Sequence, residues 1–151
     1  MKMRFWFTMV TVIIIDQISK WLVVNNMVLG ESRPFIKGIM NLTYVQNQGA
    51  AFGLFDGSTG LFIISAVVVV TAVIYYNLKH PLPFNMQIIL GLITGGACGN
   101  FIDRFLYQYV VDFLDLGWWP VFNIADMAIV IGGILLIIYT FKYEVKEETN
   151  G

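Results

Sequence analysis

Four long apolar blocks constrain this chain more than any other feature of its sequence. They cover approximately residues 5–24, 60–78, 85–104 and 121–141. A helix of ~20 residues, rising ~1.5 Å per residue, is long enough to cross the ~30 Å hydrocarbon core of a bilayer. The sequence therefore predicts an all-α membrane protein with four transmembrane helices, and residues 1–151 are expected to form a single integral membrane domain.

The composition agrees with a membrane protein and excludes several other classes. Hydrophobic residues make up 58% of the chain and charged residues 13%, whereas about a quarter of the residues in a soluble domain are charged. The net charge of −1 gives no electrostatic footprint for a nucleic acid. Because Cys98 and His80 are the only residues of their types, an intrachain disulfide is excluded, as is a zinc site of four cysteines or of two cysteines and two histidines. We expect no metal site and no cofactor.

The first apolar block is predicted to be a retained span rather than a cleaved signal peptide. Lys2 and Arg4 precede it, as basic residues precede a signal peptide, but the block continues past Asp16 and Lys20 without a small-residue cleavage site. Basic residues in short loops mark the cytoplasmic side of a membrane protein. One side carries more of them, namely Lys2, Arg4, Lys79, Lys142 and Lys146. This bias predicts that both termini are cytoplasmic.

Two segments are expected on the other, outer side of the membrane. The segment at about 29–59 is rich in turn residues, and Asn41–Gln46 within it contains β-forming residues in rough alternation, which predicts a short strand or hairpin. The segment at about 105–118 is very apolar for a loop. We predict that it forms a short amphipathic helix on the membrane surface.

The third block contains a ridge of small residues. Gly91, Gly95 and Gly99 are spaced four residues apart, which places them on one face of a helix. Such a ridge lets a second transmembrane helix approach closely. We therefore interpret these glycines as a helix-packing surface.

Polar residues inside the blocks suggest a functional site, because ionisable groups are costly in a bilayer. Their three- and four-residue spacing groups them on single helix faces, as follows: Asp16, Ser19 and Lys20; Asn100, Asp103 and Arg104; Asn123 and Asp126. Under the predicted topology, all three groups lie in the outer half of the bilayer. Asp112 and Asp115 lie in the outer segment that leads into the last block.

Such a cluster of carboxyl groups can hydrolyse an amide bond. Two neighbouring carboxylates do not both ionise easily, so they share one proton. The ionised group takes a proton from the attacking water, and the protonated group polarises the carbonyl. No histidine, thiol or metal ion is needed, which suits a chain that has one histidine and one cysteine.

Other interpretations remain open at this point. Asp16, Lys20 and Asp103 are also compatible with buried ion pairs that only fix helix packing, and position alone does not separate Asp112 from Asp115. A metal-dependent hydrolase, an ion- or proton-coupled transporter and a structural subunit are the competing functions. Against the transporter, the polar residues occupy one half of the bilayer and do not extend through the other.

Five motifs, taken together, resemble a known family. They are DxxSK at Asp16–Lys20, NxGAAFG at Asn47–Gly53, GGxxGNxxDR at Gly95–Arg104, VVDF at Val110–Phe113 and PxFNxAD at Pro120–Asp126. The family is lipoprotein signal peptidase, also called signal peptidase II. The match follows the whole chain in order, and it departs only in the residue before Pro120, where tryptophan replaces the expected phenylalanine.

The resemblance implies a fold and a reaction. The family's members are bacterial inner-membrane aspartyl proteases with four spans and an outer β-cradle. They remove the signal peptide from diacylglyceryl-modified prolipoproteins, cleaving before the lipidated cysteine, and globomycin inhibits them. The implied partners here are prolipoproteins, membrane lipids and globomycin, with no nucleic acid, and the implied state is a monomer with its active site at the outer face.

The resemblance also implies roles for individual residues. The catalytic pair corresponds to Asp112 and Asp126. The substrate-binding positions correspond to Asn47, Gly49, Asn100, Arg104 and Asn123. The positions that hold the site together correspond to Asp16, Lys20 and Asp103.

Overall fold

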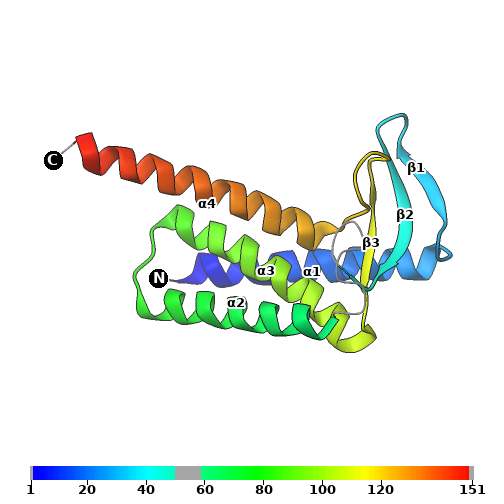
Figure 1. The fold of residues 1–151 in the computed structure, drawn as a ribbon, viewed down its shortest axis with the longest axis horizontal. Helices are drawn as coiled ribbons and strands as arrows, with labels where there is room; N and C mark the ends of the chain where they lie inside the picture. The colour runs from blue at the N-terminus through cyan, green and yellow to red at the C-terminus, as the bar shows by residue number, and fades with distance from the viewer. Residues whose placement is uncertain (1, 50–58, 150–151) are drawn as a thin grey trace.

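Four long helices form most of the molecule (Figure 1). The computed structural model describes residues 2–49 and 59–149, with side chains described as far as residue 142. The helices are α1 (Met3–Asn26), α2 (Thr59–Lys79), α3 (Phe84–Tyr107) and α4 (Ile124–Thr149). Each contains a stretch long and apolar enough to cross a membrane, so the four predicted spans are confirmed.

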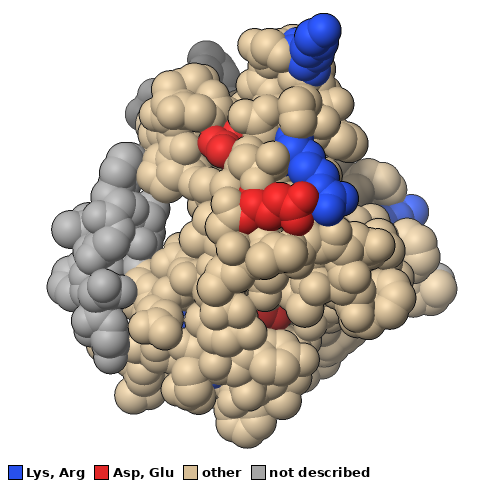
Figure 2. Space-filling model, turned by 90° about the vertical axis from the view of Figure 1, so that its right-hand side faces the viewer, with Lys and Arg blue, Asp and Glu red and all other residues tan. Residues whose placement is uncertain are grey.

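A small antiparallel sheet lies at one end of the helices, and both chain ends lie at the opposite end (Figure 1). Its strands are β1 (Ser32–Ile36), β2 (Met40–Asn47) and β3 (Val110–Asp115), in the order β1-β2-β3. The predicted hairpin around Asn41–Gln46 is thus confirmed. Figure 2 views this end and shows a mainly uncharged surface with a few separate groups of acidic and basic side chains.

The predicted surface helix at 105–118 is wrong. Helix α3 continues to Tyr107, Gln108 adopts a left-handed conformation with φ 65°, and the chain then enters strand β3. Most of β3 is buried, and a strand buried on both faces shows no alternation in its sequence. A short apolar run of this kind cannot be told from a helix by periodicity, although its valines and phenylalanine favour a strand.

The last helix also begins later than the predicted residue 121. Phe122 still pairs with Leu114 of β3 as an isolated bridge. Helix α4 then starts with a reciprocal cap, in which the Asp126 N–H donates to Asn123 Oδ1 (2.9 Å) and the Asn123 N–H donates to Asp126 Oδ2 (3.2 Å). This arrangement satisfies two backbone donors that a helix start leaves free. It also fixes the Asp126 side chain at the sheet end of the molecule.

The glycine ridge of α3 is a helix-packing surface, as predicted, and its partner is α1. A β-carbon on Gly91 would lie 2.8 Å from Thr8 Cβ, and one on Gly95 would lie 2.8 Å from Val12 Cβ. A β-carbon on Gly99 would lie 2.6 Å from an oxygen of Asp16. Real side chains do not tolerate such distances, so glycine at these positions allows the two helices to approach.

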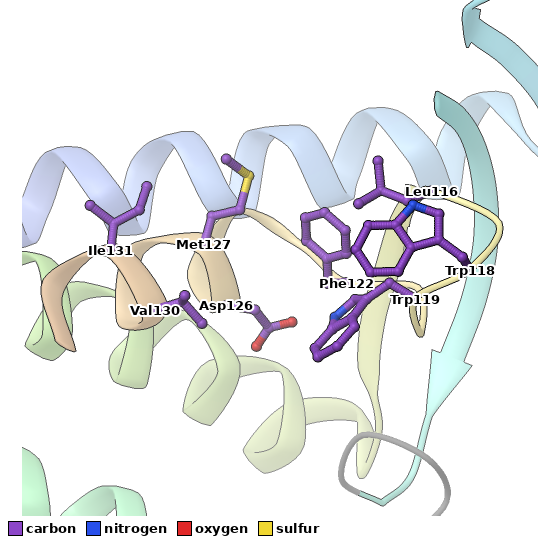
Figure 3. Close-up of a pocket in the computed structure, with 8 residues that line it drawn as sticks. All are labelled: Leu116, Trp118, Trp119, Phe122, Asp126, Met127, Val130 and Ile131. Atoms are coloured by element: carbon purple, nitrogen blue, oxygen red, sulfur yellow. The ribbon is translucent and has the colours of Figure 1, made fainter. Parts of the chain in front are cut away.

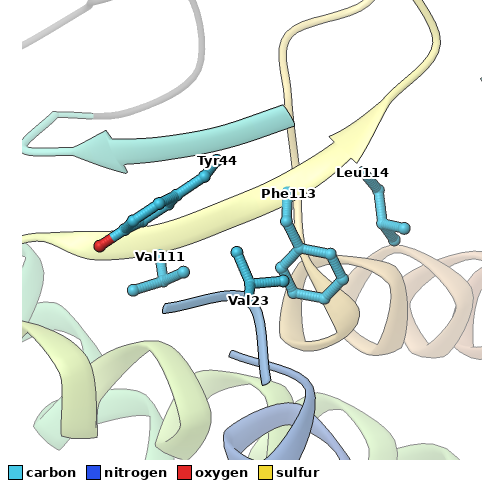
Figure 4. Close-up of a cluster of buried hydrophobic side chains, with 5 residues drawn as sticks. All are labelled: Val23, Tyr44, Val111, Phe113 and Leu114. Atoms are coloured by element: carbon cyan, nitrogen blue, oxygen red, sulfur yellow. The ribbon is translucent and has the colours of Figure 1, made fainter. Parts of the chain in front are cut away.

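A hydrophobic cluster fixes the sheet to the helices (Figure 4). Val23 of α1 packs with Tyr44 of β2 and with three residues of β3, Val111, Phe113 and Leu114. Strand β3 is therefore held between the hairpin and the helix ends. This contact sets the position of Asp112, which lies within the same strand.

Candidate active site

The Asp112 carboxyl group lies on β3 and is almost completely buried, with 2% of the residue exposed. Asn47 of β2 donates from Nδ2 to Asp112 Oδ2 (2.8 Å). Asn123 donates from Nδ2 to Asp112 Oδ1 (2.7 Å). Each carboxyl oxygen thus accepts a hydrogen bond from an asparagine, and both asparagines were among the predicted site residues.

The Asp126 carboxyl group lies in the first turn of α4. Asn100 of α3 donates from Nδ2 to Asp126 Oδ1 (2.7 Å), and the second oxygen accepts the Asn123 N–H. The positive end of the helix dipole favours a negative charge at this position. Both oxygens of the Asp126 carboxyl group thus accept a hydrogen bond.

Two asparagines link the carboxyl groups of Asp112 and Asp126. The Asn123 amide donates to Asp112 and also to Asn100 Oδ1 (3.0 Å), while the Asn100 amide donates to Asp126. Asn123 is completely buried, so it lies beneath the pair and does not line the cavity above it. The pair is thus held in place from below by side chains that carry no charge.

Burial and charge act together on Asp112. Loss of water contact is the larger cause and the negative charge of Asp126 the next, and together they raise the pKa of the Asp112 carboxyl to about 7. The hydrogen bonds from Asn47 and Asn123 act in the opposite direction, because they stabilise the carboxylate. A carboxylic acid with such a pKa can both hold and release a proton near neutral pH.

A cavity of about 300 Å³ opens above the pair. Its lining includes both carboxyl groups and four of the predicted binding residues, Asn47, Gly49, Asn100 and Arg104. These residues come from β2 and its following turn, α3, β3 and α4. Predicted site residues as far apart in the chain as Asn47 and Asp126 therefore line one space, in agreement with the predicted convergence.

Arg104 brings a positive charge to this cavity. Its Nη2 donates to the Gly49 carbonyl oxygen (3.3 Å), and its guanidinium lies 4.9 Å from the centre of the Phe62 ring. Within the part of the chain that the structure describes, its buried Nε has no hydrogen-bond partner. One donor of Arg104 is therefore unpaired among the described residues.

A second polar cluster lies directly below and contains the three predicted supporting residues. Lys20 Nζ lies 2.8 Å from Asp16 Oδ2 and 2.9 Å from Asp103 Oδ2, and it donates to Asn100 Oδ1 (3.1 Å). All three charged residues are buried. The interpretation of these groups as buried ion pairs is confirmed, and Asn100 connects them to the carboxyl pair.

The supporting carboxylates also hold the elements that carry the pair. Asp16 Oδ1 accepts the Ala125 N–H (2.9 Å) at the start of α4, and Asp103 Oδ2 accepts the Val111 N–H (3.1 Å) of β3. The backbone on which Asp112 lies and the helix turn that presents Asp126 are thus tied to the same ion cluster.

Gln17 belongs to this network but was not predicted. Its Nε2 donates to Asp103 Oδ1 (2.9 Å) and to the Gly99 carbonyl oxygen (3.2 Å). The signal was present in the sequence, since an amide side chain beside Asp16 in an apolar block needs a buried partner.

Asp115 is separated from the site. It accepts hydrogen bonds from Thr43 Oγ1 (2.6 Å) and from the Gly117 N–H (2.7 Å), and it does not line the cavity. The remainder of the NxGAAFG motif, residues 50–53, lies outside the described residues. Among the described residues, no three histidine, cysteine or acidic side chains are grouped so that they could hold a metal ion.

Comparison with known proteins identifies the family. The family model for signal peptidase (SPase) II matches residues 8–142 of this chain. The chain belongs to the signal peptidase II family. The matched range includes the sheet and reaches into all four helices.

Curated relatives and solved structures agree with this assignment. A lipoprotein signal peptidase of Syntrophomonas wolfei is 51% identical, covering 98% of this chain and 99% of the relative. The lipoprotein signal peptidase of Halothermothrix orenii is 49% identical, and the match covers 88% of this chain and 92% of the relative. A solved bacterial membrane enzyme at 37% identity has a TM-score of 0.87, with 91% of this chain and 87% of that chain aligned. The chain is therefore a multi-pass membrane peptidase of this family.

Proposed function

We propose that this protein is a membrane aspartyl endopeptidase that removes the signal peptide from diacylglyceryl-modified prolipoproteins, cleaving before the lipidated cysteine. One observation carries the proposal: two carboxyl groups, Asp112 and Asp126, line one cavity and are joined by hydrogen-bonded asparagines. Membership of the signal peptidase II family supports the class of reaction and the lipoprotein precursor as substrate.

The environments of the two carboxyl groups suggest their roles. Asp112 holds the proton at rest, since its pKa of about 7 keeps much of it neutral. Asp126 is the base, because Asp112 holds the proton of the pair. Asp126 takes a proton from water as the water oxygen attacks the scissile carbonyl carbon, and Asp112 donates its proton toward the carbonyl oxygen. The proton on Asp126 then passes to the leaving amine as the C–N bond breaks, and a hydroxyl of the tetrahedral intermediate returns its proton to Asp112.

The cavity walls would bind the peptide around the scissile bond. Arg104 and Asn47 line the cavity and carry side-chain donors, and peptide carbonyl oxygens that leave water need such donors. The supporting cluster of Asp16, Lys20 and Asp103 would keep the two carboxyl groups at a fixed separation, because it holds the backbone on either side of them.

The proposed location is the bacterial cytoplasmic membrane, with both termini cytoplasmic and the active site at the outer face. Both chain ends lie opposite the sheet (Figure 1), so the basic residues near the termini support an outer location for the sheet and the cavity. The scissile bond of a lipid-anchored cysteine lies at this depth. We further propose that the protein acts as a monomer and that globomycin binds in the cavity.

The test is cleavage of a purified precursor. Wild type, Asp126→Asn and the matched control Asp115→Asn would be incubated with diacylglyceryl-modified and unmodified precursor, each with and without a chelator. Wild type and Asp115→Asn should cleave the modified precursor alone, and Asp126→Asn should cleave neither. Cleavage by Asp126→Asn at the wild-type rate would overturn the carboxyl pair as the catalytic group, and inhibition of wild type by the chelator would favour a metal-dependent reaction.

A further inference from the structure

Two apolar cavities adjoin the candidate site on different sides of α4. The first, the loop cavity, has a volume of about 430 Å³ and contains Trp118, Trp119, Val130 and Ile131 in its wall. Figure 3 shows the two tryptophan rings on one side of this space and the α4 side chains on the other, with Asp126 between them. Among the described residues, Asp126 is the one charged residue in this wall.

The second cavity, the interhelix groove, has a volume of about 250 Å³ and runs between α2 and α3. Ser65, Ala66 and Ala97 make part of its wall, and Ile129 of α4 closes one side. The groove ends at Asn100 and Arg104, which also line the candidate site. The loop cavity therefore reaches Asp126, and the interhelix groove reaches the candidate site at Asn100 and Arg104, from a different direction.

The substrate of the proposed function has two apolar parts. One is the hydrophobic helix of the signal peptide, which precedes the scissile bond, and the other is the pair of acyl chains on the cysteine that follows it. Both parts stay in hydrocarbon while the bond between them lies at the carboxyl groups. Each part therefore needs its own apolar surface, and these surfaces must diverge from the site.

The interhelix groove suits a helix. Small side chains such as Ser65, Ala66 and Ala97 let the backbone of another helix approach closely. An arriving helix whose C-terminus lies at the site has carbonyl groups without partners and the negative end of its dipole there. Arg104, at the end of the groove, offers a positive charge and a buried Nε that has no partner among the described residues. The chemistry of Arg104 thus complements a helix C-terminus.

The loop cavity suits an acyl chain. Its wall contains bulky aromatic and branched side chains, which leave an irregular space that a flexible chain fills better than a helix does. From Asp126 it extends along α4 to Ile131, a distance of about 7.5 Å toward the middle of the bilayer. A chain that starts at the cysteine beside Asp126 would run down this wall.

We propose that the interhelix groove binds the signal-peptide helix, with Arg104 contacting its last carbonyl groups, and that the loop cavity binds an acyl chain of the diacylglyceryl group. This inference rests on the proposed function. It adds an assignment of the two halves of the substrate to two surfaces of this chain, and it makes residues on α2 and α4 specificity determinants.

Site-specific cross-linking tests the assignment. A photoreactive amino acid would replace Ala66 in the groove or Ile131 in the loop cavity, and the controls would be Val68 and Ile137, which are exposed and line neither cavity. Each protein would also carry Asp126→Asn, so that the bound precursor is not cleaved. The precursor would carry an epitope before its signal helix and radioactive acyl chains.

The expected result is a cross-link from position 66 to the signal peptide and from position 131 to the acyl chains, with neither at the control positions. The reverse pattern, equal yields at the controls, or cross-links to bilayer lipid alone would each overturn the assignment. Cleavage of the same precursor by wild type is measured in parallel. If wild type does not cleave it, the proposed function itself fails, and that failure is distinct from a wrong assignment.

Steric variants of the active enzyme provide a second readout. Ile131→Trp should lower kcat/KM about tenfold for a precursor with long acyl chains and much less for one with short chains. Ala97→Leu should raise KM for both precursors equally, because it narrows only the groove. If kcat/KM depends on acyl-chain length in the same way in wild type and in Ile131→Trp, the acyl chain does not bind in the loop cavity.

Discussion

Two clusters of carboxyl groups lie next to each other at the sheet end of the helices. They differ in the groups that contact the carboxyl oxygens. In the lower cluster, Lys20 lies between Asp16 and Asp103 and contacts both. In the upper cluster, Asp112 and Asp126 are joined by neutral asparagine amides, and no ion pair reaches either of them among the described residues.

The difference separates a structural role from a chemical one. A lysine that uses three donors on fixed acceptors holds helices together and has no donor left for a substrate. A buried carboxyl pair without a direct counter-ion keeps a proton near neutral pH, as the pKa of Asp112 indicates. Changes to the upper cluster should therefore affect the reaction, and changes to the lower cluster should affect the fold.

Replacement of Asp112 should give the largest effect. Asp112→Asn removes the proton donor, and kcat should fall by roughly 10⁴-fold or more, since residues that act as a catalytic unit cannot substitute for one another. The Tm in detergent should fall only slightly, because an amide of similar shape replaces the buried acid and loses one of its two hydrogen bonds from asparagine. If Asp112→Asn is stable and keeps more than a tenth of the wild-type activity, the upper cluster does not have the proposed catalytic role.

Replacement of Lys20 should act on stability. Lys20→Met leaves Asp16 and Asp103 buried without their counter-ion, which should cost about 3–5 kcal/mol in the free energy of unfolding. Lys37→Met, at an exposed position, is the control and should change little. Thermal unfolding of both variants measures the difference, and an unchanged Tm for Lys20→Met would contradict a structural role.

A methyl group in the glycine ridge should have a smaller effect. Gly99→Ala places a carbon 2.6 Å from an Asp16 oxygen, so α1 and α3 must separate, at a cost of about 1–3 kcal/mol. Gly133→Ala is the matched control, because nothing lies within 4 Å of its added carbon. The control should be neutral or stabilising, since alanine favours a helix more than glycine does. Equal Tm values for the two variants would contradict the packing account.

Removal of a single donor in the upper cluster should have the smallest effect. The Asn47 amide stabilises the ionised form of Asp112, so Asn47→Ala should raise the pKa of Asp112 further, by about one unit or less. The alkaline limb of kcat/KM should then move to higher pH. A shift to lower pH would show that Asn47 does not act on the ionised carboxyl group.

Much of the fold could be predicted, because apolar length and glycine spacing report directly on membrane spans and their packing. The segment that became β3 could not. Its residues are buried on both faces by contacts with β2 and the helix ends, and those long-range contacts leave no periodicity in the sequence. Helix α4 also begins later than its apolar block predicts, because Asn123 lies within that block but caps the helix.

The site residues could be predicted from the motifs, but their connections could not. Without the motifs, position alone did not separate Asp112 from Asp115. The pairing of β3 with β2 separates them by placing Asp112 opposite Val45 and Asp115 opposite Asn41, at different ends of the strand pair. The sequence also did not show that Asn123 lies beneath the carboxyl pair, or that Gln17 joins the ion cluster.

The dependence of kcat/KM on pH tests most directly whether Asp112 is the proton donor. It would be measured between about pH 5 and pH 9 for wild type and for Asp115→Asn, because kcat/KM reports the ionisation of the free enzyme. Asp112 loses its proton as the pH rises through its pKa of about 7, so kcat/KM should fall about tenfold per unit above that pH in both proteins. A profile that stays flat to pH 9, or an alkaline limb that disappears in Asp115→Asn, would contradict the account.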